Sequence, residues 1–290
     1  VHGGVAINEL GVFNDGLLAI LGNGNIRAEG TLEDPVLFKT DRLEEEFDEL
    51  QGQWSGILLS RNSRGNTITH TSIENAIVGL SVDSSASVCI KSSTIAYTGG
   101  SGISASHASI YAENSLFYQN AGSGISLTYG GNYVFNYCTI ANFNNQDPAL
   151  QANNIRCLNS DCSQAAFNDL KCNFTNCIFM GNDRDEISFL DAFAGVEPGA
   201  FQYNFEHCIV RIDELLDANA YPNFFNNCVN CKNIDTSDTL FVSVSDNDYR
   251  LDTMSIAIDM GVDLPFVDRD ILDFPREAGS PDIGCYEFQK

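Results

Sequence analysis

The sequence repeats one short pattern between Trp54 and Ile140, with a period of 21 to 24 residues. Each copy contains a glycine followed by an aliphatic residue, at Gly56-Ile57, Gly79-Leu80, Gly102-Ile103 and Gly124-Ile125. Later in each copy come an apolar residue, a small residue and an aliphatic residue: Ile68, Thr71, Ile73; Ile90, Ser93, Ile95; Tyr111, Asn114, Leu116; Phe135, Cys138, Ile140. This second half continues with longer gaps at Phe174, Cys177, Phe179; Phe205, Cys208, Val210; and Phe225, Cys228, Asn230. The chain is therefore predicted to be a repeat protein.

The residues within each copy distinguish between the two folds that such a period allows. Leucine-rich repeats need several leucines and a fixed asparagine, whereas these segments are rich in Ile, Val, Thr, Ser and Tyr and alternate with a period of two. They predict an all-β parallel β-helix of about ten coils, at roughly 22 to 30 residues per coil, with less than a fifth of the chain in α-helix. Coils stacked about 4.8 Å apart bury equivalent side chains in columns. The predicted inward column is Ile68, Ile90, Tyr111, Phe135, Phe174, Phe205 and Phe225.

The repeat also indicates how the chain is organised. Residues 1–234 are predicted to form the coils, with insertions at 141–171, 181–200 and 213–222 where the rhythm stops. The insertions enter at corresponding points after the third residue of the pattern, so we expect them to stack on one side and to favour binding. Residues 235–290 leave the repeat and are expected to cap the open strand edges of the last coil.

Ten cysteines in 290 residues are too few for a disulfide scaffold. Cys138, Cys177, Cys208 and Cys228 occupy one position of the repeat, where a thiol serves as a small apolar group. Because stacked coils hold their Cβ atoms farther apart than the roughly 3.8 Å of a relaxed disulfide, we predict four free, buried thiols. Two alternatives stay open for Cys157 and Cys162, a loop disulfide or free thiols.

The charge of the chain restricts its partners. With 39 acidic and 15 basic residues the net charge is -24, so the overall field repels nucleic acid, and repels uronate polymers unless cations bridge them. No apolar run approaches the roughly 18 residues that span a bilayer. The first residues are already strand-like, so an export signal is expected upstream of residue 1. We expect a monomer without a required cofactor, calcium excepted.

Both ends of the sequence resemble a known family. The relevant segments are Ile26 to Phe38, Trp54-Ser-Gly-Ile-Leu58, Thr239 to Val242, Asn247 to Leu251, Ser255-Ile-Ala-Ile-Asp-Met-Gly261 and Ser280-Pro-Asp-Ile-Gly-Cys-Tyr-Glu-Phe288. They resemble the right-handed parallel β-helix family of choice-of-anchor type, with Ile256 where proline is usual and Cys285 where alanine is usual. The resemblance implies a secreted or surface-anchored bacterial protein with pectate-lyase-like architecture and no established chemistry. Fold alone does not carry activity from one protein to another.

Catalysis has one candidate location. The Asn-Thr-Asp, Asp-Asp, Gly-His-Gly and Arg-Ile-Lys strings of polygalacturonases do not occur, and neither does the Trp-Ile-Asp-His string of pectate lyases. If the outward face near Lys91 is open to solvent, His70, Lys91, Glu113 and Tyr137 would lie within one or two coils of each other and could transfer protons. This is the basis of the alternative hypothesis, a polysaccharide lyase or glycoside hydrolase. The other interpretation is an ordinary polar face with Lys91 paired to Glu113.

Binding is the preferred hypothesis, either of a polysaccharide or cell-surface glycan or as a structural element. A carbohydrate site combines aromatic rings with amides and carboxylates. The first insertion supplies such residues in Tyr129, Tyr133, Phe143, Asn144, Asn145 and Asp147. The weak calcium candidates are Asp183, Asp185 and Glu186, followed by Asp268, Asp270 and Asp273. Cys228 and Cys231 lack the second pair that a zinc finger needs.

Overall fold

Strands account for most of the regular structure. The computed structural model describes residues 5–8, 11–14, 16–42, 44–143, 145–197, 199–217, 221 and 223–289, with side chains described from residue 16 onwards except at 217. Helical structure among these residues is confined to the short α1 (Glu214–Asp217) and the 3-10 turns η1 (Glu45–Phe47) and η2 (Phe224–Asn227). The prediction of little α-helix is therefore confirmed.

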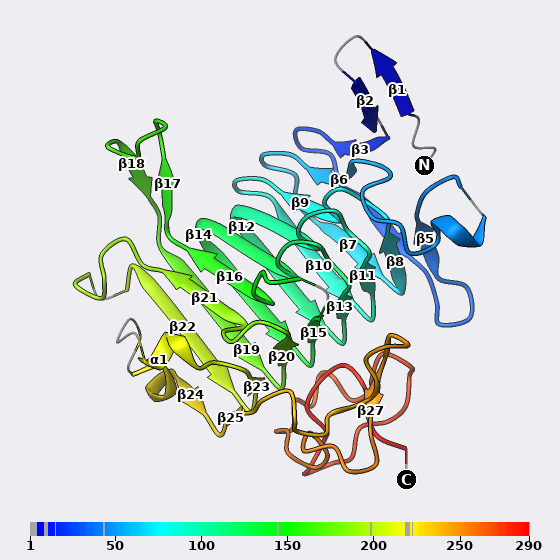
Figure 1. The fold of residues 1–290 in the computed structure, drawn as a ribbon, viewed down its shortest axis with the longest axis vertical. Helices are drawn as coiled ribbons and strands as arrows, with labels where there is room; N and C mark the ends of the chain where they lie inside the picture. Colours follow the sequence, from blue (N-terminus) through cyan, green and yellow to red (C-terminus); the bar gives the residue numbers. More distant parts are fainter. Residues whose placement is uncertain are drawn as a thin grey trace.

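The strands form three parallel stacks, and each turn of the chain contributes to all three, except that the last turn contributes only to the second and third (Figure 1). The first stack contains β3 (Leu17–Ile20), β6 (Gly56–Leu59), β9 (Leu80–Val82), the first parts of β12 (Ile103–Glu113) and β14 (Ile125–Asn136), β16 (Leu150–Asn153) and β21 (Ile187–Leu190). The second contains β4 (Arg27–Glu29), β7 (Asn66–Thr69), β10 (Ser87–Lys91), the second parts of β12 and β14, β19 (Leu170–Thr175), β22 (Phe201–Glu206) and β24 (Cys228–Val229). The third contains β5 (Val36–Phe38), β8 (Thr71–Glu74), β11 (Thr94–Ala96), β13 (Leu116–Tyr118), β15 (Thr139–Asn142), β20 (Ile178–Gly181), β23 (Ile209–Val210) and β25 (Lys232–Asn233).

The chain is a right-handed parallel β-helix. The third stack is an eight-stranded sheet, so the described residues form eight coils rather than the expected ten. The estimate was too high because later coils are longer: the equivalent residues Cys138 and Cys177 are separated by 39 positions, and Cys177 and Cys208 by 31.

Three antiparallel hairpins lie outside the stacks. They are β1 (Val5–Asn8) with β2 (Gly11–Asn14), β17 (Ile155–Cys157) with β18 (Ala165–Phe167), and β26 (Phe241–Ser243) with β27 (Asp248–Leu251). No helix in the described part of the chain is long and apolar enough to cross a membrane.

The predicted inward column is largely confirmed. Ile68, Ile90, Phe135, Phe174 and Phe205 are almost completely buried. Tyr111 and Phe225 were assigned wrongly. Parallel pairing aligns Ile90 with Ala112 and Phe205 with Cys228, so Ala112 and Cys228 occupy those two positions. Tyr111 therefore faces outward, and Phe225 lies in η2 with its side chain 40% exposed.

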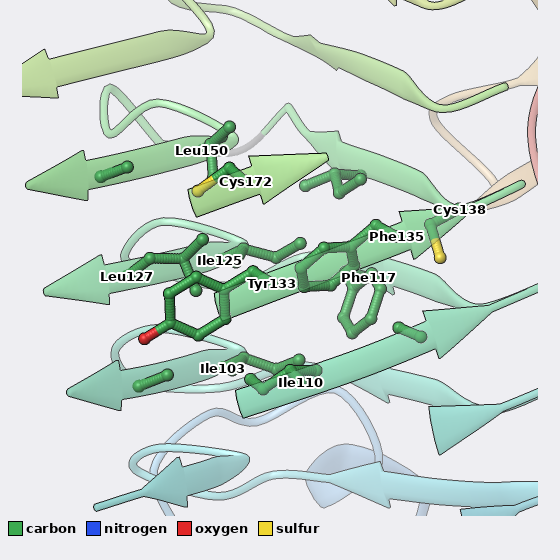
Figure 2. Close-up of a cluster of buried hydrophobic side chains, with 14 of the residues drawn as sticks. Ile103, Ile110, Phe117, Ile125, Leu127, Tyr133, Phe135, Cys138, Leu150 and Cys172 are labelled. Atoms are coloured by element: carbon green, nitrogen blue, oxygen red, sulfur yellow. The ribbon is translucent and has the colours of Figure 1, made fainter. Parts of the chain in front are cut away.

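Aromatic rings fill the later coils of the core. The ring of Phe174 stacks against those of Phe135 and Phe205, with centroids 5.4 and 4.7 Å apart. Figure 2 shows Phe135 beside Phe117 and Tyr133 inside the β-helix. Such spacing is that of stacked coils, so each ring buries its face against the coil above and the coil below.

A second inward column lies where the second stack turns into the third. The residue before it has positive φ in successive coils, as at His70, Asn114 and Asn176. The column residue makes two hydrogen bonds. Ser93 donates to the Lys91 carbonyl and accepts from the Thr71 N–H of the preceding coil. Cys177 likewise donates to the Thr175 carbonyl and accepts from the Cys138 N–H. Serine and cysteine are interchangeable here because both side chains can donate and accept.

The thiol prediction is confirmed for three cysteines and wrong for the fourth. Cys138, Cys177 and Cys208 are free and buried. Cys228 forms a disulfide with Cys231, because the last turn is short enough to bring their Cα atoms within 5.6 Å. Pairing of Ile209 with Lys232 shows that Cys231 continues the cysteine column. Cys157 and Cys162 form the second disulfide, at the tip of the β17–β18 hairpin.

The insertions are smaller than predicted and enter at a different corner. The regular strand β16 lies within 141–171, and β21 within 181–200. What leaves the coil is the β17–β18 hairpin and the loop 191–200, both between the first and second stacks rather than after the third. Residues 213–222 include α1 and lie partly outside the described residues.

The C-terminal segment 235–289 does not cover the end of the last coil as expected. It lies beside the stack, against the outer face of the third sheet (Figure 1). Alternation places Phe117 inside and its neighbour Leu116 outside, so this face presents apolar side chains that need a cover. The apolar cluster beneath the segment joins Leu116, Ala141, Ile178, Met180 and Ile209 to Leu240, Tyr249, Leu251, Ala257, Ile271, Ile283 and Cys285.

Candidate functional site

The predicted group around Lys91 is only partly assembled. The Lys91 ammonium lies 2.8 Å from a carboxylate oxygen of Glu113 on the next coil. The Tyr111 hydroxyl donates to the other oxygen of that carboxylate, and Asn136 donates to the Tyr111 hydroxyl at 3.5 Å. Sequence reasoning missed Tyr111 because it had been assigned to the interior. The Tyr111 hydroxyl and the Lys91 ammonium together hold the Glu113 carboxylate between two donors.

This arrangement favours a charged lysine. The hydrogen bond that the Lys91 ammonium donates to Glu113 raises the pKa of Lys91 above its ordinary value, although partial burial opposes the shift. Burial and the hydrogen bond to Glu113 likewise raise the pKa of Tyr111. The Lys91 ammonium and the neutral Tyr111 phenol cannot abstract a proton. Their contacts with Glu113 are suited to holding neighbouring coils together.

The side chains of the other two residues of the predicted group have different surroundings. His70 lies in the turn between the second and third stacks and lines a small hollow beneath the C-terminal segment, with Leu272 and Tyr286. The Tyr137 hydroxyl donates to the Val262 carbonyl at 2.8 Å, so this side chain is held under the same segment. The His70 backbone N–H donates to the Lys91 carbonyl at 3.1 Å, but within the described residues neither the imidazole nor the Tyr137 phenol joins the hydrogen-bonded group of Lys91, Tyr111 and Glu113.

The predicted carbohydrate-binding residues are also separated. Tyr133 is fully buried and its hydroxyl donates to the Gly130 carbonyl at 2.9 Å. Phe143 packs against Phe241 and Tyr249 of the C-terminal segment. Their assignment to a ligand was wrong because both rings fill the protein itself.

Asn145 and Asp147 belong to a turn. The Asn145 side chain donates to the Gly122 carbonyl at 3.0 Å and accepts from the Asp147 N–H at 2.7 Å. The amide therefore anchors the loop after β15 to the previous coil, and of the two only Asp147 is exposed. Asn144 lies outside the described residues.

Tyr129 lies at an accessible polar location. It lies at the corner between the first and second stacks, where β14 bends at positive φ. The guanidinium of Arg156, from the β17–β18 hairpin, lies 4.2 Å above its ring, and the ring of His107 is 5.7 Å away. Tyr129 thus links the disulfide-closed hairpin to the corner of the coils.

Next to it an open groove of about 680 Å³ runs along this corner. We call it the corner groove. Its lining residues are Arg64, Ser85, Ala86, Ser87, His107, Ala108, Ser109, Gly131, Asn132, Asp169 and Lys171. They come from five consecutive coils, so the groove spans four coil rises, about 19 Å at about 4.8 Å per rise.

Local sequence explains why the surface is hollow here. The floor consists of small residues at equivalent positions, because Ser87, Ser109 and Asn132 pair in register. A Cβ atom at Gly131 would lie 2.6 Å from the Ala108 carbonyl oxygen, so only glycine permits this approach of the coils. Long side chains occur only at the two ends, Arg64 and Lys171.

The polar groups of the corner groove have few protein partners. Within the described residues, no ion pair involves Arg64 or Lys171, and Arg64 Nε donates to the Ser85 carbonyl at 3.1 Å. The Nδ1 atom of His107 is buried and has no hydrogen-bond partner in the described part. Sequence reasoning missed these residues because they do not form a motif; the signal available was basic residues near turn positions of successive repeats in an acidic chain.

The calcium candidates are not assembled into a site. Asp185 accepts from the Asp213 N–H, whereas Glu186 is buried and accepts from the N–H groups of Ala149 and Asp183. Asp270 is likewise buried and binds backbone N–H groups, and Asp273 pairs with Arg269. Across the described residues, no group of three His, Cys, Asp or Glu side chains could hold a metal ion.

A second hollow, of about 510 Å³, lies at the end of the core. It is lined by inward-facing rings of the seventh coil, including Phe189, Phe201 and Tyr203, and by Tyr221. The eighth coil has η2 in place of a first-stack strand, which leaves these rings incompletely covered. The hollow is therefore explained by packing.

Comparison with known proteins agrees with this geometry. The family model described as right-handed beta helix region matches residues 55–247, from the second coil onwards. No curated protein matches the sequence. Among solved structures, the chain is similar to the crystal structure of pectate lyase Pel9A, with 12% sequence identity, a TM-score of 0.35, and coverage of 95% of this chain and 86% of that chain. That likeness is too low to inform the activity of this chain.

Proposed function

Because this chain belongs to the family of right-handed β-helix proteins, whose stacked coils present extended outer surfaces, we propose that it binds a polysaccharide along the corner groove without cleaving it. The observation that carries this proposal is the shape of the groove. A hollow about four coil rises long, with a low floor and polar walls, suits a linear polymer better than a compact ligand.

The chemistry of the lining supports a glycan. Ser85, Ser87, Ser109 and Asn132 supply hydroxyl and amide groups that both donate and accept hydrogen bonds. Sugar hydroxyl groups need such partners, and the ring of Tyr129, covered by Arg156, supports His107 at the edge of the groove.

The absence of catalysis is part of the proposal. The corner groove contains no pair of carboxylates, since Asp169 is the single acidic residue of its lining. The Lys91 and Glu113 pair lies outside the groove and is engaged in its own ion pair. A lyase or hydrolase acting near Lys91 remains the alternative that an activity assay must test.

We further propose that the protein is exported to the bacterial cell surface or medium, as the choice-of-anchor resemblance implies. The two disulfides support this location, because disulfides persist in oxidising compartments and are rare in the cytosol. Fractionation of the source bacterium with an antibody against the protein would test the proposal. Detection only in the cytosol would contradict it.

A pair of substitutions on one strand tests groove binding. Ser109 lies on the groove floor and Ser104 lies outside the groove, and both belong to β12 and face outward. We expect Ser109→Trp to block the groove and to weaken glycan-array binding at least about tenfold, whereas Ser104→Trp should retain it. Equal loss in both variants, or binding unaffected by Ser109→Trp, would contradict the proposal, as would an array without any bound glycan.

A further inference from the structure

The corner groove has the opposite charge balance to the rest of the chain. Its lining contains Arg64 and Lys171 against the single carboxylate of Asp169, and Arg156 lies beside it on the ring of Tyr129. The whole chain has 39 acidic and 15 basic residues, more than two acids for each base. Three bases with one acid are therefore a local inversion of charge.

The two basic residues of the lining are also available to a ligand. Lys171 begins the outward face of β19 and is exposed, and no ion pair involves it within the described residues. Among the described residues the Arg64 guanidinium donates only through its Nε atom, to the Ser85 carbonyl, which leaves both terminal nitrogens to bind an oxyanion. By contrast Lys91, also on the second stack, is already paired with Glu113.

We propose that the corner groove selects glycans that carry carboxylate or sulfate groups, and that Arg64 and Lys171 each hold one such group near its two ends. This inference rests on the proposed function and narrows the class of ligand. Arg64 and Lys171 come from the second and sixth coils, so the ligand would carry anionic groups about 19 Å apart, four rises of about 4.8 Å.

The overall charge of -24 does not prevent such binding. At physiological ionic strength the Debye length is about 8 Å, so exposed charges elsewhere on an elongated molecule act weakly on a ligand in the groove. Local bases then determine the preference. The overall field should chiefly slow the approach of an acidic polymer and make its rate depend on salt.

The test compares glycans that differ only in charge. The probes are dextran sulfate against dextran, and a hyaluronan oligosaccharide against its carboxyl methyl ester, measured by calorimetry or surface binding. We expect the charged form of at least one pair to bind at least about tenfold more tightly than its neutral counterpart. The two pairs distinguish sulfate from carboxylate as the recognised group.

Charge variants identify the residues responsible. Lys171→Ala and Arg64→Ala should each weaken binding of the acidic probe at least about fivefold and leave binding of the neutral probe unchanged. Lys232→Ala is the matched control, because it removes an exposed lysine on β25, outside the groove, and changes the net charge by the same amount. Weakening of the same size in Lys232→Ala would overturn the inference, because the net charge alone would then explain the loss.

Other outcomes separate this inference from the proposed function. The charge preference would be overturned if neutral glycans bind as tightly as acidic ones. If Ser109→Trp also loses that binding, the groove would still be a glycan site. The charge preference would also be overturned if an acidic probe binds Lys171→Ala as tightly as the wild type but no longer binds when EDTA is added. A bridging cation, rather than the lysine, would then hold the ligand. Binding of no glycan at all would overturn both proposals.

Discussion

The guanidinium of Arg276 lies 3.7 Å above the ring of Tyr137, and this contact fastens the C-terminal segment to the coils. Arg276 Nη2 also donates to the Asn114 side chain at 2.7 Å, and Nη1 lies 3.2 Å from the Glu287 carboxylate. The side chains of Arg276 and Glu287 are only 3% and 6% exposed. One arginine thus joins two coils to a buried acid of the segment that covers them.

Removing this arginine should detach the cover. Arg276→Met leaves Glu287 buried without its counter-ion, and breaking a buried pair in this way typically costs about 3–5 kcal/mol. We expect a lower melting temperature and faster proteolysis within residues 235–289. The control is Arg269→Met, which breaks an exposed pair with Asp273 and should cost no more than about 1 kcal/mol. Similar effects in both variants would contradict the anchoring role of Arg276.

Stability should fall as pH rises from about 4.5 to 7. Burial raises the pKa of Glu186 from 4.5 to about 7, although two backbone N–H donors oppose the shift. Between these values the folded protein binds more protons than the unfolded chain, so the free energy of unfolding decreases with rising pH. The pKa of Asp282, raised by burial to about 6, acts in the same direction. Thermal melting at several pH values should show a shallower decline in Glu186→Gln than in the wild type or in the exposed Glu197→Gln.

The denatured, unreduced protein should contain six reactive thiols. The structure pairs Cys157 with Cys162 and Cys228 with Cys231, and leaves six cysteines free: Cys89, Cys138, Cys172, Cys177, Cys208 and Cys285. Thiol titration in guanidinium chloride measures this number directly. Eight or ten thiols in protein purified without reductant would show that one or both disulfides do not form.

The repeat in the sequence was sufficient to predict the fold but not every register. Tyr111 appeared to continue the apolar column because it follows Ile90 by about one period, yet Ala112 faces inward. From sequence alone, a coil that is one residue shorter looks the same as a strand whose side chains point to the opposite face. Only the pairing of the strands distinguishes the two. For the same reason Cys228 was assigned to the cysteine column, which Cys231 in fact continues.

The lateral position of the C-terminal segment could not be predicted for another reason. The repeat pattern placed Leu116 at the same position as the buried Ile73, Ile95 and Ile140, so nothing in the sequence indicated an apolar outer face that needs a cover. The candidate site was missed for a similar reason, since Arg64 and Lys171 are distant in sequence and are brought into one groove only by the stacking of five coils. Sequence patterns report periodicity well, whereas a groove depends on which small residues coincide on neighbouring coils.

The cysteine column should tolerate serine better than an apolar residue. Cys177 accepts from the Cys138 N–H and donates to the Thr175 carbonyl, as Ser93 does in its own coil. Cys177→Ser retains both hydrogen bonds, so we expect a change in unfolding free energy of no more than about 1 kcal/mol. Cys177→Val leaves the buried N–H of Cys138 without an acceptor, at a cost of about 1–3 kcal/mol, and its additional methyl group crowds the core further. Equal stability of the two variants, measured by urea unfolding, would contradict this role.

The last prediction is that the protein does not cleave polysaccharides. A lysine can remove a proton only as the neutral amine, whereas the hydrogen bond that Lys91 donates to Glu113 raises the pKa of Lys91 and keeps the amine protonated near neutral pH. The side chains of His70 and Tyr137, which would have to assist, lie under the C-terminal segment, although the His70 backbone contacts Lys91. Incubation with pectin, alginate, chondroitin and neutral plant glycans, with and without calcium, should yield neither unsaturated ends nor new reducing sugar. Turnover that is abolished in Lys91→Ala but retained in Lys39→Ala would show that the outward face near Lys91 is an active site and that the non-catalytic proposal is wrong.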